Sequence, residues 1–382
     1  MKNRRAFLYG ATALAGAWMA NGLDGVWVDG RSDQAIAATK QNRASSGARS
    51  LRERAEAKGL LYGAAVETRG LSETDFADCL ARECSILVPE NELKWARVRP
   101  SQNQFNFAGS DRLAEFASQH QMKFRGHTLV WHGSVPAWLT ETATSRNAEE
   151  LLENHISTVV KRYAGRVHSW DVVNEAVYLG SEGVNGLRNN LWHRLLGPSY
   201  IDTAFRTAAA ADPNALLVYN DYGLDIDDDE QNARRARVLQ LLERLKSDGV
   251  PVHALGTQAH LWAGESRFNP TKLRQFLRDV ADLGLKILVT ELDVVDRNLP
   301  RDIARRDRGV ADTYRAYLDA ALDEPAVIGV LTWGLSDRRT WLARSRPRRD
   351  GAPVRPLPFD SQMRPKPAYE AIAAAFDAAP DR

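Results

Sequence analysis

Short apolar runs alternate with longer amphipathic segments along almost the whole chain, and this alternation limits the possible folds more than any other feature. Segments such as Ala148–Tyr163 and Gln231–Lys246 carry apolar residues at helical spacing, with charged residues on the opposite face. The runs between such segments are as short and as continuously apolar as the buried strands of a parallel sheet. The pattern therefore predicts repeated strand–helix units around a parallel β-sheet.

Eight of the apolar runs have the length of a strand, which predicts a sheet that closes into a barrel. An open doubly wound sheet is the alternative, but no Gly-rich phosphate loop follows any run, so nucleotide binding has no support. We therefore predict an α/β fold in one domain, a (β/α)8 TIM barrel over residues 45–382 with the helices as its outer ring. The strands are expected near Leu61–Ala65, Ile86–Pro89, Lys123–His127, Ser169–Asn174, Leu216–Asn220, Ala254–Gln258, Lys286–Glu291 and Ile328–Trp333.

Residues 1–40 are expected to be an export signal and linker rather than part of the fold. Arg4 and Arg5 precede an uncharged run over residues 6–23, which is the pattern of a twin-arginine signal. The run is rich in Ala and Gly and close to the shortest length that spans a bilayer, so we expect cleavage rather than anchoring. Residues 35–37 and 15–17 both have the small side chains of a processing site. The protein is therefore expected to be periplasmic or secreted.

The balance of charges argues against two classes of partner. Lys and Arg total 51 against 49 for Asp and Glu, so the formal net charge is +2. That balance gives no reason to expect nucleic acid or an anionic membrane surface as a partner. The two cysteines, Cys79 and Cys84, lie near the expected end of one helix, where their side chains point apart. We expect two buried free thiols rather than a disulfide or a metal site.

Residues able to hydrogen-bond or stack follow seven consecutive predicted strands. In a barrel of this kind the active site lies at the C-terminal ends of the strands. These residues are Glu90, Asn91 and Lys94 after the second strand, His127, Trp131 and His132 after the third, Asn174 and Glu175 after the fourth, Asn220, Asp221 and Tyr222 after the fifth, Gln258 and His260 after the sixth, Glu291 and Asp293 after the seventh, and Trp333, Asp337 and Trp341 after the eighth. Such a set predicts one active site at that end of the barrel.

Two glutamates in this set, Glu175 and Glu291, meet the needs of a glycosidase. Such an enzyme uses one carboxylic acid to protonate the leaving oxygen and a second carboxylate to attack or to activate water. The two follow the fourth and seventh strands, so their side chains can face each other across the barrel mouth. Both end apolar runs, where a charge is unfavourable without a partner or a task. Carboxylates about 5–5.5 Å apart give retention and about 6.5–9.5 Å give inversion, and the sequence leaves this gap open.

Three histidines and two tryptophans of the set also need an interpretation. The spacing of His127 and His132 is not the one-turn helical spacing of a zinc protease. Hydrogen bonds to sugar hydroxyls or to the nucleophile account for both of them and for His260, so no metal is predicted. Ten Trp is a high number, and the flat face of Trp packs in a core or against a sugar ring. Trp333 and Trp341 are interpreted as a platform and a wall around a sugar.

The motifs that contain these residues resemble those of glycoside hydrolase family 10, the barrel-fold endo-β-1,4-xylanases. The resemblance covers nearly all of the expected domain, and the complete set in this order is highly specific. The motifs are Pro89–Trp95 (PENELKW), Gly126–His132 (GHTLVWH), Trp170–Ala176 (WDVVNEA), Asn220–Tyr222 (NDY), Gln258–His260 (QAH), Val289–Asp293 (VTELD), Trp333–Asp337 (WGLSD) and Pro365–Tyr369 (PKPAY).

The resemblance implies a retaining endo-1,4-β-xylanase acting on xylan and xylo-oligosaccharides, with Glu175 as acid/base and Glu291 as nucleophile. His260 would bridge Glu291 and Asp293 and so hold the nucleophile ionised, and Asn174 would contact the sugar 2-hydroxyl. The other implied substrate-binding residues are Lys94, Asn91, His127, Gln258 and Trp333 where the bond breaks, Glu90 and Trp341 at the next sugar on the non-reducing side, and Trp131 and Tyr222. No feature requires a cofactor or a protein partner, and a monomer is expected.

The chain departs from the family pattern in two places. Ser134 stands where the family usually has Gln, two residues beyond the His of the third-strand motif, so a substrate hydrogen bond there would be lost or water-mediated. The loop after Trp341 carries five arginines. It is either a solvated loop or a surface on the active-site face that favours xylan with acidic uronic side groups. The arginines are Arg344, Arg346, Arg348, Arg349 and Arg355.

Two other functions stay open at this point. Retaining barrel enzymes that cut β-1,4-glucan or mannan use the same pair of carboxylates, so they are the closest alternative. A catalytically inactive carbohydrate-binding barrel is the alternative of another class. Such proteins usually lack one carboxylate, whereas this chain has both Glu175 and Glu291.

Overall fold

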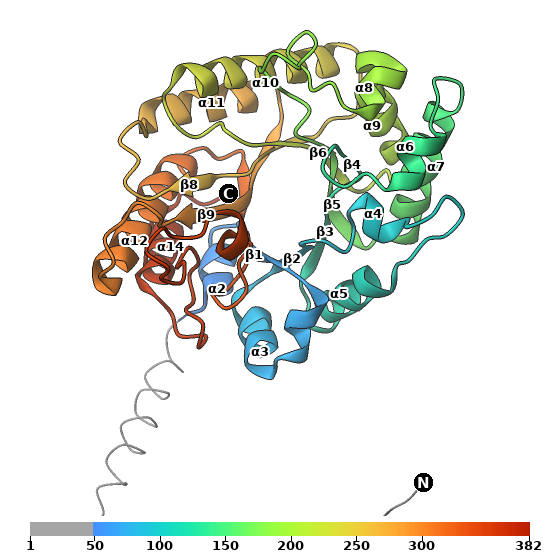
Figure 1. Cartoon of the computed structure of the whole chain (residues 1–382). Helices are drawn as coiled ribbons and strands as arrows, with labels where there is room; N and C mark the ends of the chain where they lie inside the picture. The colour runs from blue at the N-terminus through green and yellow to red at the C-terminus, as the bar shows by residue number, and fades with distance from the viewer. Residues whose placement is uncertain (1–48) are drawn as a thin grey trace, which may run out of the picture. The chain divides into compact units, whose positions relative to one another are not determined.

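Eight parallel strands form a closed barrel in the computed structural model, which describes residues 49–382 (Figure 1). The last of these strands pairs with both the seventh and the first, so the sheet has no open edge. This confirms the predicted (β/α)8 barrel. The barrel strands are β1 (Leu61–Val66), β2 (Ile86–Pro89), β3 (Lys123–Gly126), β5 (Val167–Asn174), β6 (Leu216–Asp221), β7 (Ala254–Thr257), β9 (Lys286–Val295) and β10 (Val327–Thr332).

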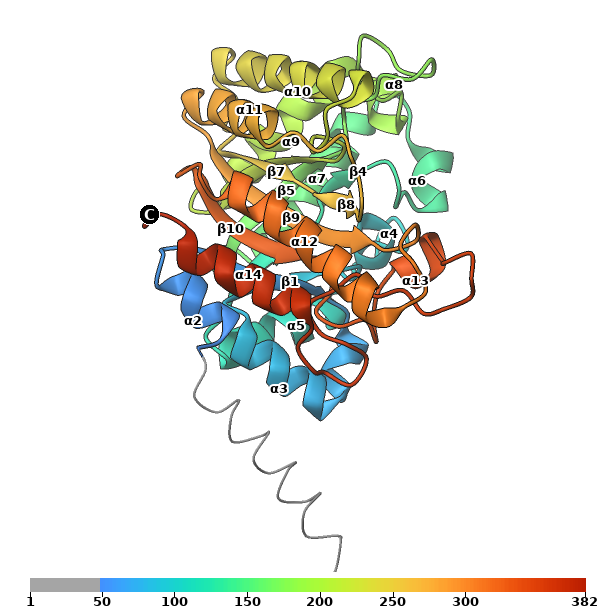
Figure 2. The same ribbon diagram turned by 90° about the vertical axis from the view of Figure 1, so that its left-hand side faces the viewer.

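A ring of helices surrounds the barrel and connects its strands (Figures 1 and 2). Several begin at a side chain that caps the first turn. The side chain of Asp228 accepts from the Gln231 amide, and that of Asn269, directly before Pro270, accepts from the Lys272 amide. α12 and α14 pack side by side, as Figure 2 shows. The longer helices are α3 (Thr74–Glu83), α5 (Ala108–Gln119), α7 (Ala148–Arg162), α9 (Tyr200–Ala211), α10 (Asp229–Ser247), α11 (Pro270–Asp282), α12 (Ile303–Ala321) and α14 (Pro367–Ala378).

Short elements lie before β1, at the strand ends and in the loops. They are α2 (Leu51–Glu56), α4 (Trp95–Val98), α6 (Ala137–Thr142), α8 (Leu191–Leu196), α13 (Leu342–Ser345), the 3-10 turns η1 (Thr68–Ser72) and η2 (Gly197–Ser199), and the strands β4 (Val130–Trp131) and β8 (His260–Trp262). None of the helices in residues 49–382 has the length and apolar character needed to cross a bilayer. The expected export signal, residues 1–40, lies outside the described residues.

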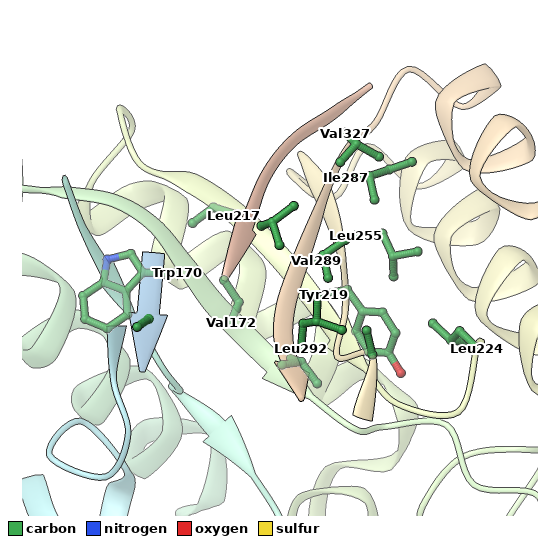
Figure 3. Packing of buried hydrophobic residues seen from close by; sticks show 14 of the residues in the cluster. Trp170, Val172, Leu217, Tyr219, Leu224, Leu255, Ile287, Val289, Leu292 and Val327 are labelled. Carbon is green, nitrogen blue, oxygen red and sulfur yellow. The ribbon is translucent and has the colours of Figure 1, made fainter. Parts of the chain in front are cut away.

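Alternate residues of the strands face two different cores. On β6, Leu217 and Tyr219 pack outward against the helices, as Figure 3 shows, while Val218 between them belongs to the cluster inside the barrel. The interior cluster contains Ala65, Ile86, Val88, Val218, Ala254, Leu288, Leu331 and Trp333. Each buried aliphatic side chain contributes about 1.5–3 kcal/mol. The strands are buried on both faces, which explains why their sequences read as continuous apolar runs.

The barrel interior also holds a buried ion pair directly beneath the cavity. Arg125 of β3 pairs with Asp171 of β5, and it donates a second hydrogen bond to Ser169 at 2.8 Å. Both charged side chains are almost completely buried. Removing one partner of such a pair costs about 3–5 kcal/mol, because it leaves an uncompensated charge. The other oxygen of Asp171 contacts Nδ1 of His127 at 2.9 Å, so this pair also orients a residue of the predicted site.

The observed elements differ from the predicted ones mainly at their ends. β9 continues to Val295, four residues beyond the expected end, because the unpredicted strand β8 pairs with this extension through His260 and Asp293. The other unpredicted strand, β4, pairs with the end of β5. Cys79 and Cys84 are free and buried, as expected, and burial raises the pKa of the Cys79 thiol to about 12.

Candidate active site

A cavity of about 990 Å³ lies at the C-terminal ends of the barrel strands. Most of the residues predicted from the sequence line it: Lys94, His127, Trp131, Asn174, Glu175, Tyr222, Gln258, His260, Glu291, Trp333 and Trp341. Asp293 does not line the cavity and is fully buried, in contact with His260. Glu90 and Asn91 are not part of the cavity wall. The fold therefore gathers residues from seven of the eight barrel strands, or from the loops after them, into one site.

Glu291 is held by contacts to its side chain within the barrel wall. It is 5% exposed, and its Oε1 accepts from Nδ2 of Asn220 at 2.8 Å. Nε2 of His260 lies 3.2 Å from its Oε2. Burial alone raises the pKa of this carboxyl, but the hydrogen bond from His260, the charge of His127 and the amide of Asn220 outweigh burial and lower the pKa. Glu291 is therefore kept ionised although it is buried.

His260 links Glu291 to a second, deeper carboxylate. Its Nδ1 lies 2.9 Å from Oδ1 of Asp293, whose other oxygen accepts from Nε1 of Trp341 at 2.7 Å. Burial lowers the pKa of His260, but the two carboxylates outweigh it and raise the pKa well above its ordinary value. An imidazolium between two carboxylates donates to both, so the ring fixes the direction of the Glu291 oxygens.

Glu175 stands just beyond the end of β5 and has a left-handed backbone, with φ of 59°. Such a conformation costs a residue with a Cβ about 1–3 kcal/mol and persists only where its surroundings impose it. The Glu175 amide donates to the carbonyl of Asn220 at 2.8 Å. Its Oε1 accepts from Nε2 of Gln258 at 3.0 Å, and its Oε2 lies 3.8 Å from Nδ1 of His132. The side chain of Glu175 is 15% exposed, which is about twice the exposed fraction of the Glu291 side chain.

A chain of amide groups connects the two glutamates. Nδ2 of Asn220 donates to Glu291 and also to Oδ1 of Asn174 at 2.9 Å, and Gln258 reaches both Asn174, at 3.3 Å, and Glu175. Asn220 is itself oriented by Thr290, whose hydroxyl donates to its Oδ1 at 2.7 Å. The neighbouring strand carries Gly256, where a Cβ would lie only 2.2 Å from that oxygen. Because Gly256 has no Cβ, it leaves space for the Asn220 amide, which contacts both Asn174 and Glu291.

Lys94, Trp131 and Trp333 form one wall of the cavity. Nζ of Lys94 lies 5.1 Å from the ring centre of Trp131 and 5.9 Å from that of Trp333. His127 packs edge-on against Trp333, with ring centres 5.1 Å apart. Burial lowers the pKa of Lys94, while the nearby glutamates, Glu291 first among them, oppose that effect. The wall thus offers aromatic faces and one cation to a sugar.

Glu90 and Asn91 lie next to this wall rather than in it. Oδ1 of Asn91 accepts from Nζ of Lys94 at 3.1 Å, and its Nδ2 donates to Glu67 at 2.9 Å. Asn91 lines a separate hollow of about 300 Å³ together with Glu67. Burial, and then the charge of Glu67, raise the pKa of Glu90 to about 7. Asn91 therefore connects the hollow to the main cavity through Lys94.

Tyr222 belongs to the wall on the side of Glu175. Its hydroxyl accepts from Arg188 at 3.3 Å, and the guanidinium carbon of Arg234 lies 4.4 Å from its ring centre. Asp221, the preceding residue, is fully buried and pairs with Tyr219 and, at 4.0 Å, with Arg234. Burial raises the pKa of Asp221 to about 7. Asp221 holds the base of this wall and does not line the cavity.

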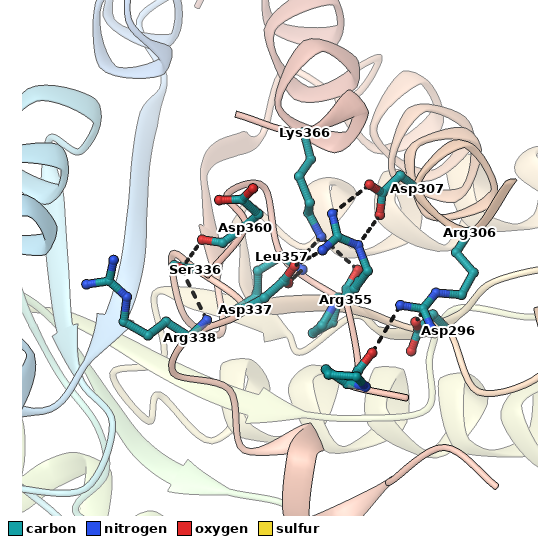
Figure 4. Close-up of polar contacts among 12 residues, drawn as sticks. Asp296, Arg306, Asp307, Ser336, Asp337, Arg338, Arg355, Leu357, Asp360 and Lys366 are labelled. Carbon is teal, nitrogen blue, oxygen red and sulfur yellow. Dashed lines mark hydrogen bonds and ion pairs between the residues drawn. The ribbon is translucent and has the colours of Figure 1, made fainter. Parts of the chain in front are cut away.

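Two interpretations of the C-terminal loop are corrected by the structure, as Figure 4 shows. Asp337, placed beside the sugar by its position after a strand, is buried away from the cavity and binds Lys366 at 2.7 Å and the Leu357 amide at 3.0 Å. Arg355 pairs with Asp307 through two hydrogen bonds of 2.7 Å, so it is neither solvated nor available to a ligand.

The other loop arginines and Ser134 also have definite places. Arg348 is 7% exposed and donates to the carbonyls of Asp296 and Leu299. Of the five loop arginines, Arg346 alone lines the cavity within the part of the chain that the structure describes. Ser134 accepts from the Ala96 amide through its carbonyl at 3.2 Å, so it supports α4 instead of lining the cavity.

Several residues that shape this site have roles that the sequence does not predict. Asn220 lies at the end of a predicted strand, but the sequence gives no sign of its position between the two glutamates. Asp171 lies inside the barrel, in the middle of a motif, and Trp262 lines the cavity two residues beyond His260. Arg188 stands in a long loop without a recognisable motif. Its only sequence signal is its distance of thirteen residues from Glu175.

The arrangement can perform acid/base and nucleophilic chemistry on a bound sugar. It presents an ionised carboxylate, a second carboxyl group that is more exposed, and amides between them. Two of the three histidines once considered as metal ligands, His127 and His260, are each hydrogen-bonded to a carboxylate. No group of three or more His, Cys, Asp or Glu in residues 49–382 has the geometry of a metal site.

The sequence matches the pattern of glycosyl hydrolase family 10 over residues 50–375. Endo-1,4-beta-xylanase B of Thermotoga neapolitana is 37% identical over 303 residues, which are 78% of this chain and 82% of that protein. Native xylanase 10B from Thermotoga maritima has a TM-score of 0.78 and 36% identity, with 86% of this chain and 98% of that one covered. Xylanase 10B from Thermotoga petrophila RKU-1, solved in complex with xylobiose, has the same TM-score and identity over 86% and 97% of the two chains. The chain belongs to glycosyl hydrolase family 10.

Proposed function

We propose that this chain is an endo-1,4-β-xylanase that hydrolyses internal β-1,4-xylosidic bonds of xylan with retention of configuration. One observation carries the proposal: Glu291, buried and kept ionised by His260, is joined to the more exposed Glu175 by a chain of amides at one cavity. Xylan as the substrate is supported by the relatives, which are named xylanases, one of them solved with xylobiose.

In the first proposed step, a carboxylate oxygen of Glu291 attacks the anomeric carbon of a xylose unit. The bond from that carbon to the glycosidic oxygen breaks, and Glu175 gives its proton to the departing oxygen. The products are a xylosyl ester of Glu291 and a shortened chain with a new hydroxyl. The lowered pKa of Glu291 keeps this nucleophile charged.

In the second step, water attacks the anomeric carbon of the ester from the face that the leaving group vacated. Glu175, now a carboxylate, takes the proton from that water, and the bond to Glu291 breaks. Two inversions give net retention. Because Glu175 exchanges a proton in each step, its greater exposure suits the role of acid/base. Because Glu291 must stay charged between turnovers, its contact with His260 suits the role of nucleophile.

The remaining residues are proposed to hold the sugars on either side of the bond. Asn174 lies within reach of both glutamates through the amide chain, and we assign it to the 2-hydroxyl of the reacting sugar. The other proposed substrate contacts are Asn91, Lys94, His127, Gln258 and Trp333 around that sugar, Glu90 and Trp341 at the next sugar toward the non-reducing end, Trp131, and Tyr222 toward the leaving chain.

We also propose that the enzyme acts as an exported monomer. Arg4 and Arg5 before an uncharged run support twin-arginine export to the periplasm or the medium. Replacing both by Lys should leave the protein in the cytoplasm, and fractionation of cells measures this. Secretion of the double variant would contradict the proposal of export.

Size-exclusion chromatography with light scattering measures the molar mass in solution and so tests whether the enzyme is a monomer.

The reaction itself is tested by NMR of the first products released from xylan by the wild-type enzyme. We expect β-anomeric xylo-oligosaccharides of several lengths at early times. α-Anomers would show inversion and remove the role of Glu291 as a covalent nucleophile. Hydrolysis of β-glucan or mannan, with xylan left intact, would move the enzyme to the alternative substrate class.

A further inference from the structure

Arg188 lines the cavity beside Glu175, and the proposed mechanism gives this cation no task. It ends the loop that follows β5, and its amide donates to the carbonyl of Ala176 at 2.7 Å. That contact closes the loop back onto the segment that carries Glu175. No carboxylate lies within ion-pair distance of Arg188 among residues 49–382, so its charge is not used by a salt bridge.

The guanidinium contacts the backbone of Glu175 directly. Its Nε donates to the Glu175 carbonyl at 3.0 Å, and in the described part of the chain no other hydrogen bond reaches this oxygen. Glu175 has the left-handed backbone, which needs support from its surroundings. The contact thus fixes the peptide plane from which the Glu175 side chain projects. A change in that plane would move the carboxyl group relative to the bond it must protonate.

The same guanidinium also contacts Tyr222, in the part of the cavity wall that is proposed to face the leaving chain. One of its terminal nitrogens donates to the hydroxyl of Tyr222 at 3.3 Å, and the guanidinium carbon lies 4.7 Å from the ring centre of Tyr178. Arg234 covers the ring of Tyr222 from another element, at 4.4 Å. The contact with Tyr178 restricts the guanidinium, so the two hydrogen bonds from it set the distance between Glu175 and Tyr222.

We propose that Arg188 is a positioning residue that fixes the acid/base Glu175 relative to Tyr222, the wall on the leaving-chain side. This inference rests on the proposed function, because it assumes that Glu175 donates a proton to the leaving oxygen. Arg188 acts through Glu175 and does not itself contact the reacting atoms. It governs the step that needs the acid, namely protonation of a poor leaving group, and leaves the attack by Glu291 unaffected.

The test compares two substrates with opposite needs for an acid. Xylotetraose has a sugar as its leaving group and needs the proton, whereas 2,4-dinitrophenyl β-xylobioside releases a stable phenolate without one. For Arg188→Met we expect kcat/KM on xylotetraose to fall roughly 10- to 100-fold, as for a misplaced general acid, and kcat/KM on the dinitrophenyl substrate to change less than about threefold. Arg188→Lys should restore only part of the loss, because an ammonium cannot reproduce both contacts of the planar group.

Arg194→Met is the matched control. Arg194 belongs to α8, six residues further along, and it donates to the Asn189 carbonyl at 2.8 Å without contacting Glu175. Its kcat/KM should match the wild type on both substrates, and thermal melting of all variants verifies folding. Equal losses of Arg188→Met on both substrates, or no loss on either, would overturn the proposal. A wild-type enzyme that cleaves neither substrate would instead refute the proposed function.

Discussion

The two glutamates of the site are supported in different ways. Glu291 lies within a barrel strand, and both of its side-chain oxygens are bound, one by Asn220 and the other by His260. Glu175 lies beyond a strand end in a strained backbone, and its main-chain carbonyl is held by Arg188. Its Oε1 accepts from Gln258 at 3.0 Å and from Asn174 at 3.4 Å. Glu291 is therefore controlled through both oxygens of its charged group, and Glu175 through one oxygen and its backbone.

This difference follows from what each group has to do. A nucleophile that must remain charged gains from fixed donors around its oxygens, because they favour the ionised form. A proton carrier needs an oxygen that is free of permanent donors, since these would compete with the proton, and among the described residues Glu175 accepts amide hydrogen bonds through Oε1 alone. Its position is then also controlled through the main chain, where Arg188 holds the Glu175 carbonyl.

The largest expected effect comes from removing each carboxylate and supplying azide in its place. Glu291→Ala should lower kcat on every substrate by more than about 10⁴-fold, or about 5.4 kcal/mol, because the covalent route is lost. Azide then takes the position of the nucleophile, and the product is an α-xylosyl azide. Kinetics with the dinitrophenyl substrate and NMR of the azide product measure both outcomes.

Glu175→Ala is the counterpart of that experiment. It should slow xylan hydrolysis about 10²- to 10⁴-fold, the contribution of a general acid, and slow formation of the ester on the dinitrophenyl substrate far less. Azide attacks the anomeric carbon of the xylosyl ester on Glu291, so the product is a β-xylosyl azide. The same anomer from both variants would show that the two roles were assigned wrongly.

His260→Gln tests how the charge of Glu291 is controlled. A hydrogen bond to a charged group contributes about 1.5–3 kcal/mol, so kcat/KM should fall roughly 10- to 150-fold. The pKa of Glu291 is lowered by His260 against the effect of burial, so without the imidazole it rises. Because the ionised form reacts, the acidic limb of the pH profile of kcat/KM should move to higher pH. A limb that stays in place would remove His260 from this role.

The smallest expected effect concerns Arg346, the loop arginine at the cavity. It makes no ion pair within residues 49–382, so an acidic side group on xylan could pair with it. An exposed pair contributes up to about 1 kcal/mol, and Arg346→Ala should raise KM for glucuronoxylan about two- to fivefold, leaving neutral arabinoxylan unchanged. Arg349→Ala, in the same loop but away from the cavity wall, is the control. An equal change on both xylans would dismiss a uronate preference.

The fold and the place of the site could be predicted because they depend on patterns within short segments. Each barrel strand is buried on both faces and therefore reads as an apolar run, and residues at or after seven of the eight runs line the cavity. The limit of such prediction is seen at Asp337, which lies in the loop after β10. It points to Lys366 rather than to the cavity, and only the path of the last loop decides between the two directions.

Residues that act through others were the hardest to predict. Asn220 was visible at a strand end, but its two contacts depend on the register between β6 and its neighbours and on the space left by Gly256. Arg348 and Arg355 lie in a loop that reads as charged. Arg348 pairs with Asp350 nearby, but its carbonyl partner Leu299 and the Asp307 partner of Arg355 lie about fifty residues away in the chain. A single sequence does not carry information on such long-range pairings.

The pairing of β1 with β10 constrains the order in which the chain can be completed during synthesis. Leu61 pairs with Gly329, so the first barrel strand has no neighbour on one side until the last has left the ribosome. At about 5–20 residues per second that interval lasts roughly 15–50 s, during which an apolar edge is exposed to other chains. The strand edge of β1 is therefore the surface that chaperones would have to protect during synthesis.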